Sequence, residues 1–278
     1  MEVLSLTTLV GNDVLLATSS QDGQIQLFKF TENSIDSSKY SVKTSRSKYN
    51  VTLETILTGH EGWVYSVHWS PSNTLKLLSS SIDKTIIIWE YDESVNYWLE
   101  TTRLGEVGGN TLGFYGAEFG PDGKSIIAHS YHGAFHLWNY DETSNNWDPR
   151  VTMGGHFGEV IDVAWESSGE FLVSASYDQT TRVHAPWHCE NKVVPPNKYI
   201  LHFFKIIAFQ VTWHEMARPQ VHGYDLNSLA MLSRYKFVSC AEEKVIRAFQ
   251  APNNFIQNFK KLCDIKEDSA GNVLIITI

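Results

Sequence analysis

The sequence predicts an all-β chain made of repeated small sheets, the blades of a β-propeller. One cassette recurs five times, in which a turn residue is followed six positions later by a residue near the end of an apolar strand. The five pairs are Asp22 with Phe28, Asp83 with Trp89, His132 with Trp138, Asp178 with His184, and Glu243 with Phe249. Trp89, Trp138 and His184 follow one another at steps of 49 and 46 residues, close to the roughly 40 to 45 residues that one blade needs. The composition agrees, with 42% hydrophobic and 13% aromatic residues, because aromatic side chains suit packed sheets.

Alternating apolar residues and the turns between them predict the individual strands. In the clearest copy the strands cover 63–70, 75–81, 85–91 and 97–104. The same reading along the chain places blade strands at 13–30 with 51–57, 59–104, 108–153, 155–187 with 211–218, and 222–262. No segment has the convincing periodicity of an amphipathic helix.

These strands amount to about four blades plus an N-terminal half blade. That is too few for the closed ring that such blades usually form, so we expect an incomplete propeller with the shape of an open arc. An open arc exposes sheet faces at both ends, which predicts that the chain is a fragment of a longer protein.

Two steps between cassettes are too long for one blade. The first, from Phe28 to Trp89, contains the segment 31–50, which is rich in Ser, Thr and Lys and is predicted to be a disordered loop between two strands of one blade. The second, from His184 to Phe249, contains an apolar run at 199–209 that has no place in the blade pattern. This run is too short to span a bilayer, which needs about 20 apolar residues, so no membrane association is expected.

Charge and cysteine usage exclude several kinds of partner and site. The formal net charge of −9 argues against direct nucleic-acid binding, because phosphate contacts need clustered Lys and Arg. The three cysteines are far apart and fit a reducing compartment. We find no histidine or cysteine pair at ligand spacing and no phosphate loop, so neither a metal nor a cofactor is expected.

The clearest cassette begins with Gly59-His60 and ends with Asp83 and Trp89, an order that resembles the WD40 repeat. The resemblance implies a hydrogen-bonded relay in which the turn Asp orients His, His meets a strand Ser, and Ser meets the indole N–H. The relay residues it implies are His60, Ser79, Asp83 and Trp89 in one blade and His156, Ser174 and Asp178 in another, where His184 replaces the tryptophan. Ser239 and Glu243 with Phe249 are a weaker version, and the copy with His132 has Gly108-Gly109 where the histidine is expected.

A catalytic Ser-His-Asp triad is the alternative reading of these residues. We favour the structural relay because the spacing recurs with the fold. No catalytic residue is therefore predicted.

Several strings lie outside the WD40 pattern and resemble one family in particular. They are VTLETILTGH at 51–60, GEVGGNTLGFY at 105–115, DQTTR at 178–182 with APW at 185–187, VTWHEMARPQVHGY at 211–224, and EEKVIRAFQAPNNF at 242–255. In this order they resemble the WD40-repeat second subunit of the Elongator complex. Against that family, 189–210 reads as a foreign insertion, such as translated intron, and 263–278 as an atypical tail.

The Elongator resemblance implies a scaffold rather than an enzyme. It implies a subunit that holds the large scaffold subunit and the catalytic subunit together for the modification of wobble uridine in transfer RNA, in the cytoplasm and nucleus. Two alternatives come from other functional classes, one from the binding modules and one from the enzymes. One is a generic WD40 peptide-binding adaptor, such as a ligase substrate receptor or histone reader, and the other is a propeller hydrolase.

Overall fold

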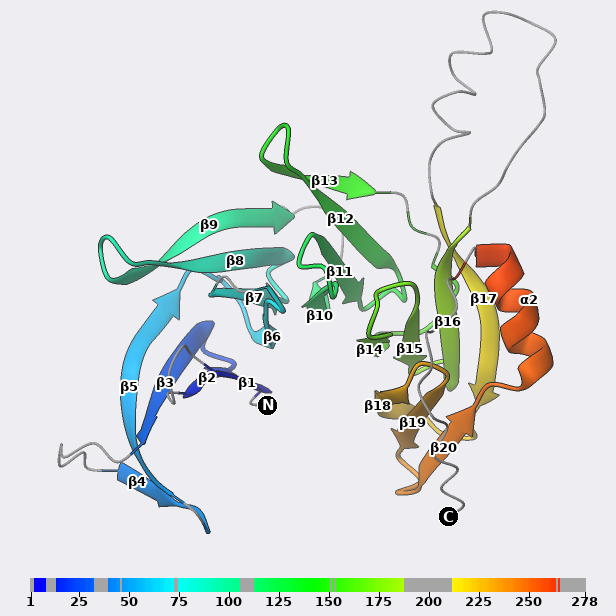
Figure 1. Ribbon diagram of the computed structural model, residues 1–278, viewed down its shortest axis with the longest axis horizontal. Helices are drawn as coiled ribbons and strands as arrows, with labels where there is room; N and C mark the ends of the chain where they lie inside the picture. Colours follow the sequence, from blue (N-terminus) through cyan, green and yellow to red (C-terminus); the bar gives the residue numbers. More distant parts are fainter. Residues whose placement is uncertain are drawn as a thin grey trace, which may run out of the picture.

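The computed structural model contains five small antiparallel sheets that follow one another around a curve (Figure 1). It describes residues 3–8, 14–32, 40–45, 47–72, 75–105, 113–150, 152, 154–187, 212–263 and 265. The prediction of an all-β propeller is confirmed. The count of four blades plus a half blade is wrong, because the N-terminal strands form a complete sheet of their own. We number the sheets as blades 1 to 5 in chain order.

Blade 1 has five strands in the order β1-β2-β3-β5-β4. They are β1 (Val3–Thr8), β2 (Val14–Ser19), β3 (Gln24–Glu32), β4 (Tyr40–Lys43) and β5 (Lys48–Thr58). The prediction of a disordered loop over 31–50 is wrong for Tyr40–Lys43, which pair with the start of β5. All four residues of β4 are exposed, its apolar Tyr40 and Val42 included, so this edge strand is held by backbone hydrogen bonds rather than by a buried face.

Blades 2 and 3 each consist of four consecutive strands joined by short turns. Blade 2 contains β6 (Val64–Trp69), β7 (Lys76–Ser81), β8 (Thr85–Asp92) and β9 (Tyr97–Gly105), and blade 3 contains β10 (Phe114–Phe119), β11 (Ser125–Ser130), β12 (Phe135–Asp141) and β13 (Asn146–Arg150). The second and third strands of blade 2 are almost wholly buried, which explains their continuous apolar runs.

Blade 4 takes its outer strand from beyond the second long step. It contains β14 (Val160–Trp165), β15 (Leu172–Ser176), β16 (Thr180–Trp187) and β17 (Thr212–Val221). β16 pairs with β17 along its whole length, from Thr180 with Val221 to Trp187 with Thr212. The segment predicted to be a foreign insertion, 189–210, lies outside the described residues.

Blade 5 contains three strands, and the helix α2 follows them in the chain. The elements are β18 (Leu226–Ser233), β19 (Lys236–Ala241), β20 (Ile246–Gln250) and α2 (Asn253–Cys263). The expectation that no amphipathic helix exists is wrong here. Phe255, Phe259 and Cys263 repeat every four residues and turn one face of α2 toward the protein. Of the predicted tail 263–278, Cys263 ends this helix and Ile265 is buried, and the other residues lie outside the described part. No helix in the described part of the chain is long and apolar enough to cross a membrane.

The apolar core is divided into four clusters, one between each pair of neighbouring blades. The cluster between blades 4 and 5 also includes Phe259 and Cys263 of α2. Blades 2, 3 and 4 are therefore each packed on both faces, blades 1 and 5 are each packed against one neighbouring blade, and rigidity comes from sheet-on-sheet packing.

The innermost strand of each of blades 2 to 5 has a β-bulge at its second residue. The pairing register shifts across Tyr65, Tyr115, Ile161 and Asn227. Just beyond two of these bulges, a side chain reaches the next inner strand, and the first is Ser66, whose Oγ accepts a hydrogen bond from Ala117 N at 3.0 Å. Asp162 accepts hydrogen bonds from Leu229 N at 2.7 Å and from Ser228 Oγ at 2.8 Å, which ties blade 4 to blade 5.

Candidate functional site

The structure brings the four predicted relay residues of blade 2 together. His60 Nδ1 lies 2.9 Å from Asp83 Oδ2, and His60 Nε2 lies 2.8 Å from Ser79 Oγ. Trp89 Nε1 donates to the same Ser79 Oγ at 2.9 Å. The relay therefore links the loop before blade 2, its second strand, the turn between its second and third strands, and its third strand.

The turn that carries Asp83 is shaped by its own side chains. Ser81 Oγ accepts from Asp83 N at 3.1 Å, and Asp83 Oδ1 accepts from Thr85 N at 2.8 Å. Lys84 has a φ of 74°, which completes the tight reversal between β7 and β8. Asp83 thus fixes its own turn with one carboxylate oxygen and holds His60 with the other.

Electrostatics keep Asp83 ionised. Burial would raise the pKa of this carboxyl, but hydrogen bonds from His60 and Thr85 outweigh burial and hold the pKa well below its ordinary value. The aspartate is therefore an acceptor across the physiological pH range.

Replacing Asp83 by alanine should lower the free energy of unfolding by about 1 to 3 kcal/mol, because His60 and the backbone N–H of Thr85 lose a buried acceptor. Urea unfolding measured by tryptophan fluorescence would give the value. Asp92→Ala is the matched control, since this half-buried aspartate at the end of β8 bonds to the neighbouring Ser94 and lies outside the relay. An Asp83→Ala midpoint equal to that of the parent protein would contradict the relay.

Blade 4 has a second relay, and it is more deeply buried. His156 Nδ1 lies 2.8 Å from Asp178 Oδ2 and His156 Nε2 lies 2.7 Å from Ser174 Oγ. His184 stands where blade 2 has tryptophan, and its Nε2 lies 3.1 Å from Ser174 Oγ. Burial lowers the pKa of His184 to about 3, so the neutral ring can take the position of the indole.

Arg182 extends the blade 4 relay to the outer strand. Its Nη2 donates to Asp178 Oδ2 at 3.0 Å and its Nη1 to Glu215 Oε2 at 2.6 Å. The arginine side chain is fully buried. Sequence reasoning missed this residue because the WD40 pattern does not include it.

Blade 5 assembles a third relay through a histidine that sequence reasoning also missed. His222 Nδ1 lies 3.0 Å from Glu243 Oε1 and its Nε2 lies 3.1 Å from Ser239 Oγ. The signal was its distance from the turn acid, which is 21 residues, against 23 for His60 and 22 for His156. Glycine follows His222 rather than preceding it, which hid the motif.

Blade 3 does not form the relay within its described residues. Ala128 occupies the position of the serine, because it lies two residues after Ile126, the partner of Trp138. His132 is exposed in its turn, and Gly108-Gly109 lie outside the described residues. The buried His129 instead reaches blade 4, with Nδ1 2.5 Å from the carbonyl oxygen of Val160.

The relay geometry fits structural support better than nucleophilic catalysis. Ser79 and Ser174 are fully buried, and each hydroxyl has hydrogen-bond partners on two sides. Among the described residues, no group of three or more His, Cys, Asp and Glu side chains is arranged to hold a metal ion.

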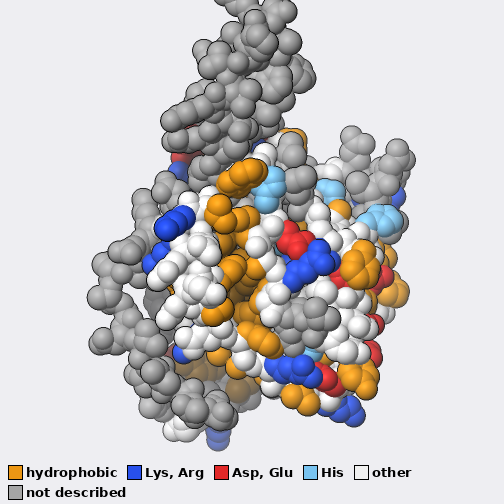
Figure 2. Space-filling view, turned by 90° about the vertical axis from the view of Figure 1, so that its right-hand side faces the viewer, with side chains coloured by type: hydrophobic (Ala, Val, Ile, Leu, Met, Phe, Trp, Pro, Cys, Tyr) orange, Lys and Arg blue, Asp and Glu red, His pale blue; other side chains and the backbone are white. Residues whose placement is uncertain are grey.

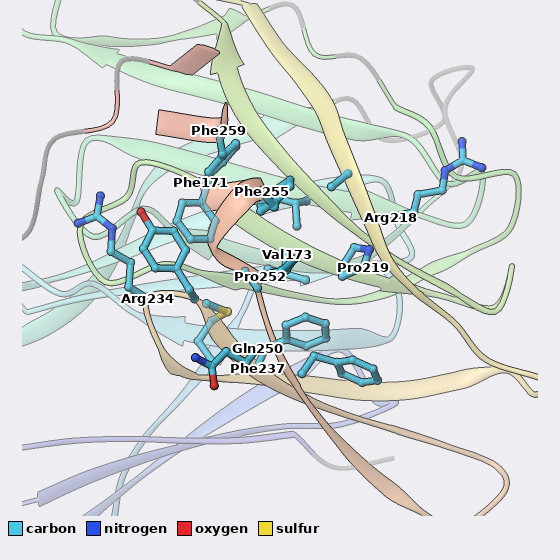
Figure 3. Close-up of a pocket in the computed structure, with 16 residues that line it drawn as sticks. Phe171, Val173, Arg218, Pro219, Arg234, Phe237, Gln250, Pro252, Phe255 and Phe259 are labelled. Atoms are coloured by element: carbon cyan, nitrogen blue, oxygen red, sulfur yellow. The ribbon is translucent and has the colours of Figure 1, made fainter. Parts of the chain in front are cut away.

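An apolar cavity of about 310 Å³ lies between blades 4 and 5 beside α2 (Figure 3). Phe171, Phe255 and Phe259 form one wall, and Arg218 and Arg234 stand at its two ends with their guanidinium groups turned outward. Figure 2 shows a band of apolar side chains on the side of the molecule that carries β17 and α2. Among the described residues that line this cavity, Arg218 and Arg234 are the charged ones.

Comparison with known proteins agrees with the repeat and extends it. A family model for the WD domain, G-beta repeat, matches residues 51–90 and 147–184. Each match starts in the fourth strand of one blade, β5 or β13, and runs through the first three strands of the next. The sequence repeat and the sheet are thus offset by one strand.

Elongator complex protein 2 of Drosophila melanogaster is 48% identical over 95% of the chain. The proteins of the same name from Homo sapiens and Arabidopsis thaliana are 43% and 36% identical over 95% and 94% of the chain. The chain belongs to the Elongator complex protein 2 family. It spans about a third of the length of these curated relatives, 34%, 32% and 33% respectively. The resemblance expected from the sequence strings is confirmed, and all three relays lie in the part shared with Elongator complex protein 2.

Proposed function

We propose that the chain acts as a non-catalytic scaffold within the Elongator complex. It would help to hold the large scaffold subunit and the catalytic subunit together for the modification of wobble uridine in transfer RNA. The observation that carries this proposal is similarity to Elongator complex protein 2 along nearly the whole chain, in animals and in a plant.

The architecture supports a scaffold rather than a reaction centre. Five sheets are packed through four apolar clusters, so the loops between strands are held in fixed positions. The Ser, His and Asp side chains that could have formed a catalytic triad are occupied by internal hydrogen bonds in blades 2 and 4. The net charge of −9 disfavours direct contact with the phosphates of transfer RNA, which supports the proposal that other subunits bind the RNA.

A tagged copy of the chain should co-purify with the other Elongator subunits, and loss of its gene should lower wobble-uridine modification. Mass spectrometry of the purified complex and of nucleosides from digested transfer RNA measures both. We also propose that the protein resides in the cytoplasm and nucleus, which fluorescence imaging of the tagged copy would test. Recovery with a ubiquitin ligase or with histones, and without Elongator subunits, would instead favour the adaptor alternative.

A double substitution, Ser79→Ala with Ser174→Ala, distinguishes a scaffold role of this chain from a catalytic role. It removes the two relay hydroxyls that could act as nucleophiles. A scaffold that still folds should restore modification in cells that lack the gene. Abolished modification with an intact complex would contradict the non-catalytic role.

A further inference from the structure

The β-bulges of blades 2 and 3 place two tyrosines at the same end of the sheets as the relays. Tyr65 and Tyr115 are the bulged residues of β6 and β10. A bulged residue is left out of the regular pairing, so its side chain can be aimed away from the sheet face. Because strands alternate in direction, this end also carries the turns between second and third strands and the loops that lead into each blade.

The two bulged tyrosines belong to an aromatic cluster. The ring of Tyr115 stacks on Tyr131, with centroids 3.9 Å apart, and Tyr65 meets both at 5.4 and 6.2 Å. Trp63, with 45% of its surface exposed, extends the cluster toward blade 1, its ring 6.3 Å from Tyr65. The three tyrosines are half-buried, so part of each ring faces solvent. We call Trp63, Tyr65, Tyr115 and Tyr131 the aromatic cluster.

Carboxylates flank the aromatic cluster on both sides. Toward blade 4, Glu159 Oε2 accepts a hydrogen bond from Tyr115 OH at 2.8 Å. Toward blade 1, Asp22 and Glu61 line a hollow of about 410 Å³ together with Trp63. Tyr177 is an exposed aromatic residue of blade 4. Its pKa is raised by burial and, to a smaller extent, by three nearby carboxylates, Glu159, Asp225 and Glu242.

Charge at this end of the molecule is strongly one-sided. The described residues of its turns and loops (20–23, 59–63, 82–84, 113, 131–134, 154–159, 177–179, 222–225 and 242–245) carry eight carboxylates and two lysines. Three of the carboxylates belong to the relays. The other five are Asp22, Glu61 and Glu159 beside the aromatic cluster, and Asp225 and Glu242 beside Tyr177. We call these five carboxylates the acidic border.

We propose that the aromatic cluster and its acidic border bind a basic, arginine-containing peptide segment of a partner protein. A guanidinium group is planar, so it stacks on an aromatic face and at the same time donates hydrogen bonds to a carboxylate. The aromatic cluster and Glu159 supply both features within one site. The acidic border draws its carboxylates from the loops of blades 1, 2, 4 and 5, which fits an extended segment better than a single small amine.

The test is a titration of the complete chain with a fluorescently labelled oligo-arginine peptide, followed by fluorescence anisotropy. We expect saturable binding that weakens as salt is raised, and tighter binding than to oligo-lysine of equal length, because lysine cannot stack through a planar group. The titration needs no other subunit, so its outcome is independent of the co-purification experiment.

Substitutions locate the binding. Tyr131→Ala and Glu159→Gln should each weaken binding about tenfold, whereas Tyr131→Phe keeps the stacking ring and should retain most of the affinity. The matched controls are Tyr97→Ala and Glu93→Gln, which change exposed residues at the opposite end of blade 2. Each glutamine variant removes one negative charge, so non-specific attraction predicts equal effects from Glu159 and Glu93. Equal effects, equal affinity for oligo-lysine, or unchanged binding by Tyr131→Ala and Glu159→Gln would each overturn the proposal.

Discussion

Replacing Arg182 by methionine should lower the free energy of unfolding by about 3 to 5 kcal/mol, because the change leaves buried carboxylate charge without its partner. Arg182 is fully buried, and it bonds to Asp178 at 3.0 Å and to Glu215 at 2.6 Å. Methionine fills much of the same volume, so the loss would come from charge rather than from a cavity. Chemical unfolding of the variant and the parent measures the difference.

Arg218→Met is the matched control for Arg182. Arg218 also pairs with Glu215, at 2.5 Å, but 53% of its side chain is exposed, so its loss should leave the unfolding midpoint nearly unchanged. The pH dependence adds a second check. Hydrogen bonds outweigh burial and lower the pKa of Asp178 and of Glu215, so both carboxylates stabilise the fold above their unfolded pKa, and this stability is lost as the pH falls. The deficit of Arg182→Met should therefore shrink at acidic pH, and a deficit that stayed constant would argue against the charge explanation.

Replacing Phe259 by alanine should lower the free energy of unfolding by about 3 to 5 kcal/mol, because it leaves a cavity where α2 packs against blades 4 and 5. Phe259 is 2% exposed, and its ring meets Phe171 edge to face at 5.4 Å and stacks with Phe255 at 5.2 Å. Unfolding curves give the total effect, and hydrogen exchange along Asn253–Cys263 reports on the helix alone.

Leu262→Ala is the control on the same helix. This leucine is 52% exposed, so its truncation should change stability by less than about 0.5 kcal/mol. Equal losses from the two substitutions would mean that α2 is not docked through Phe259.

The sequence was most informative where a turn acid precedes an apolar strand. Asp83 and Asp178 each fix a tight turn with their own side chain, so the turn acid is a strong local signal, and blades 2 and 4 could be predicted from it. The strand β4 could not, because it has only four exposed residues, and the alternation of Tyr40 and Val42 with polar residues is too short to stand out in a Ser-, Thr- and Lys-rich segment. α2 was missed although its apolar residues follow helical spacing, because the helix has only 11 residues and gives the pattern few turns in which to repeat.

The relays were predictable only as far as the motif is regular. The order of Gly59-His60, Ser79, Asp83 and Trp89 identifies its blade directly. The contact of His184 with Ser174 and that of Arg182 with Asp178 could not be predicted, because they depend on which side chains meet in the folded blade. The aromatic cluster has the same limitation, because the bulges that bring Tyr65 and Tyr115 together leave no mark in the sequence.

The one-strand offset between repeat and sheet sets an order of assembly on the ribosome. β5, the fourth strand in the order of blade 1, opens the repeat that matches at 51–90, and β13, the fourth strand of blade 3, opens the repeat at 147–184. A nascent blade thus stays open at its outer edge until the first strand of the following repeat has emerged. Deleting one repeat by gene rearrangement would damage two sheets at once, whereas a cut in the loop at 59–63 or 154–159 would leave whole sheets on both sides.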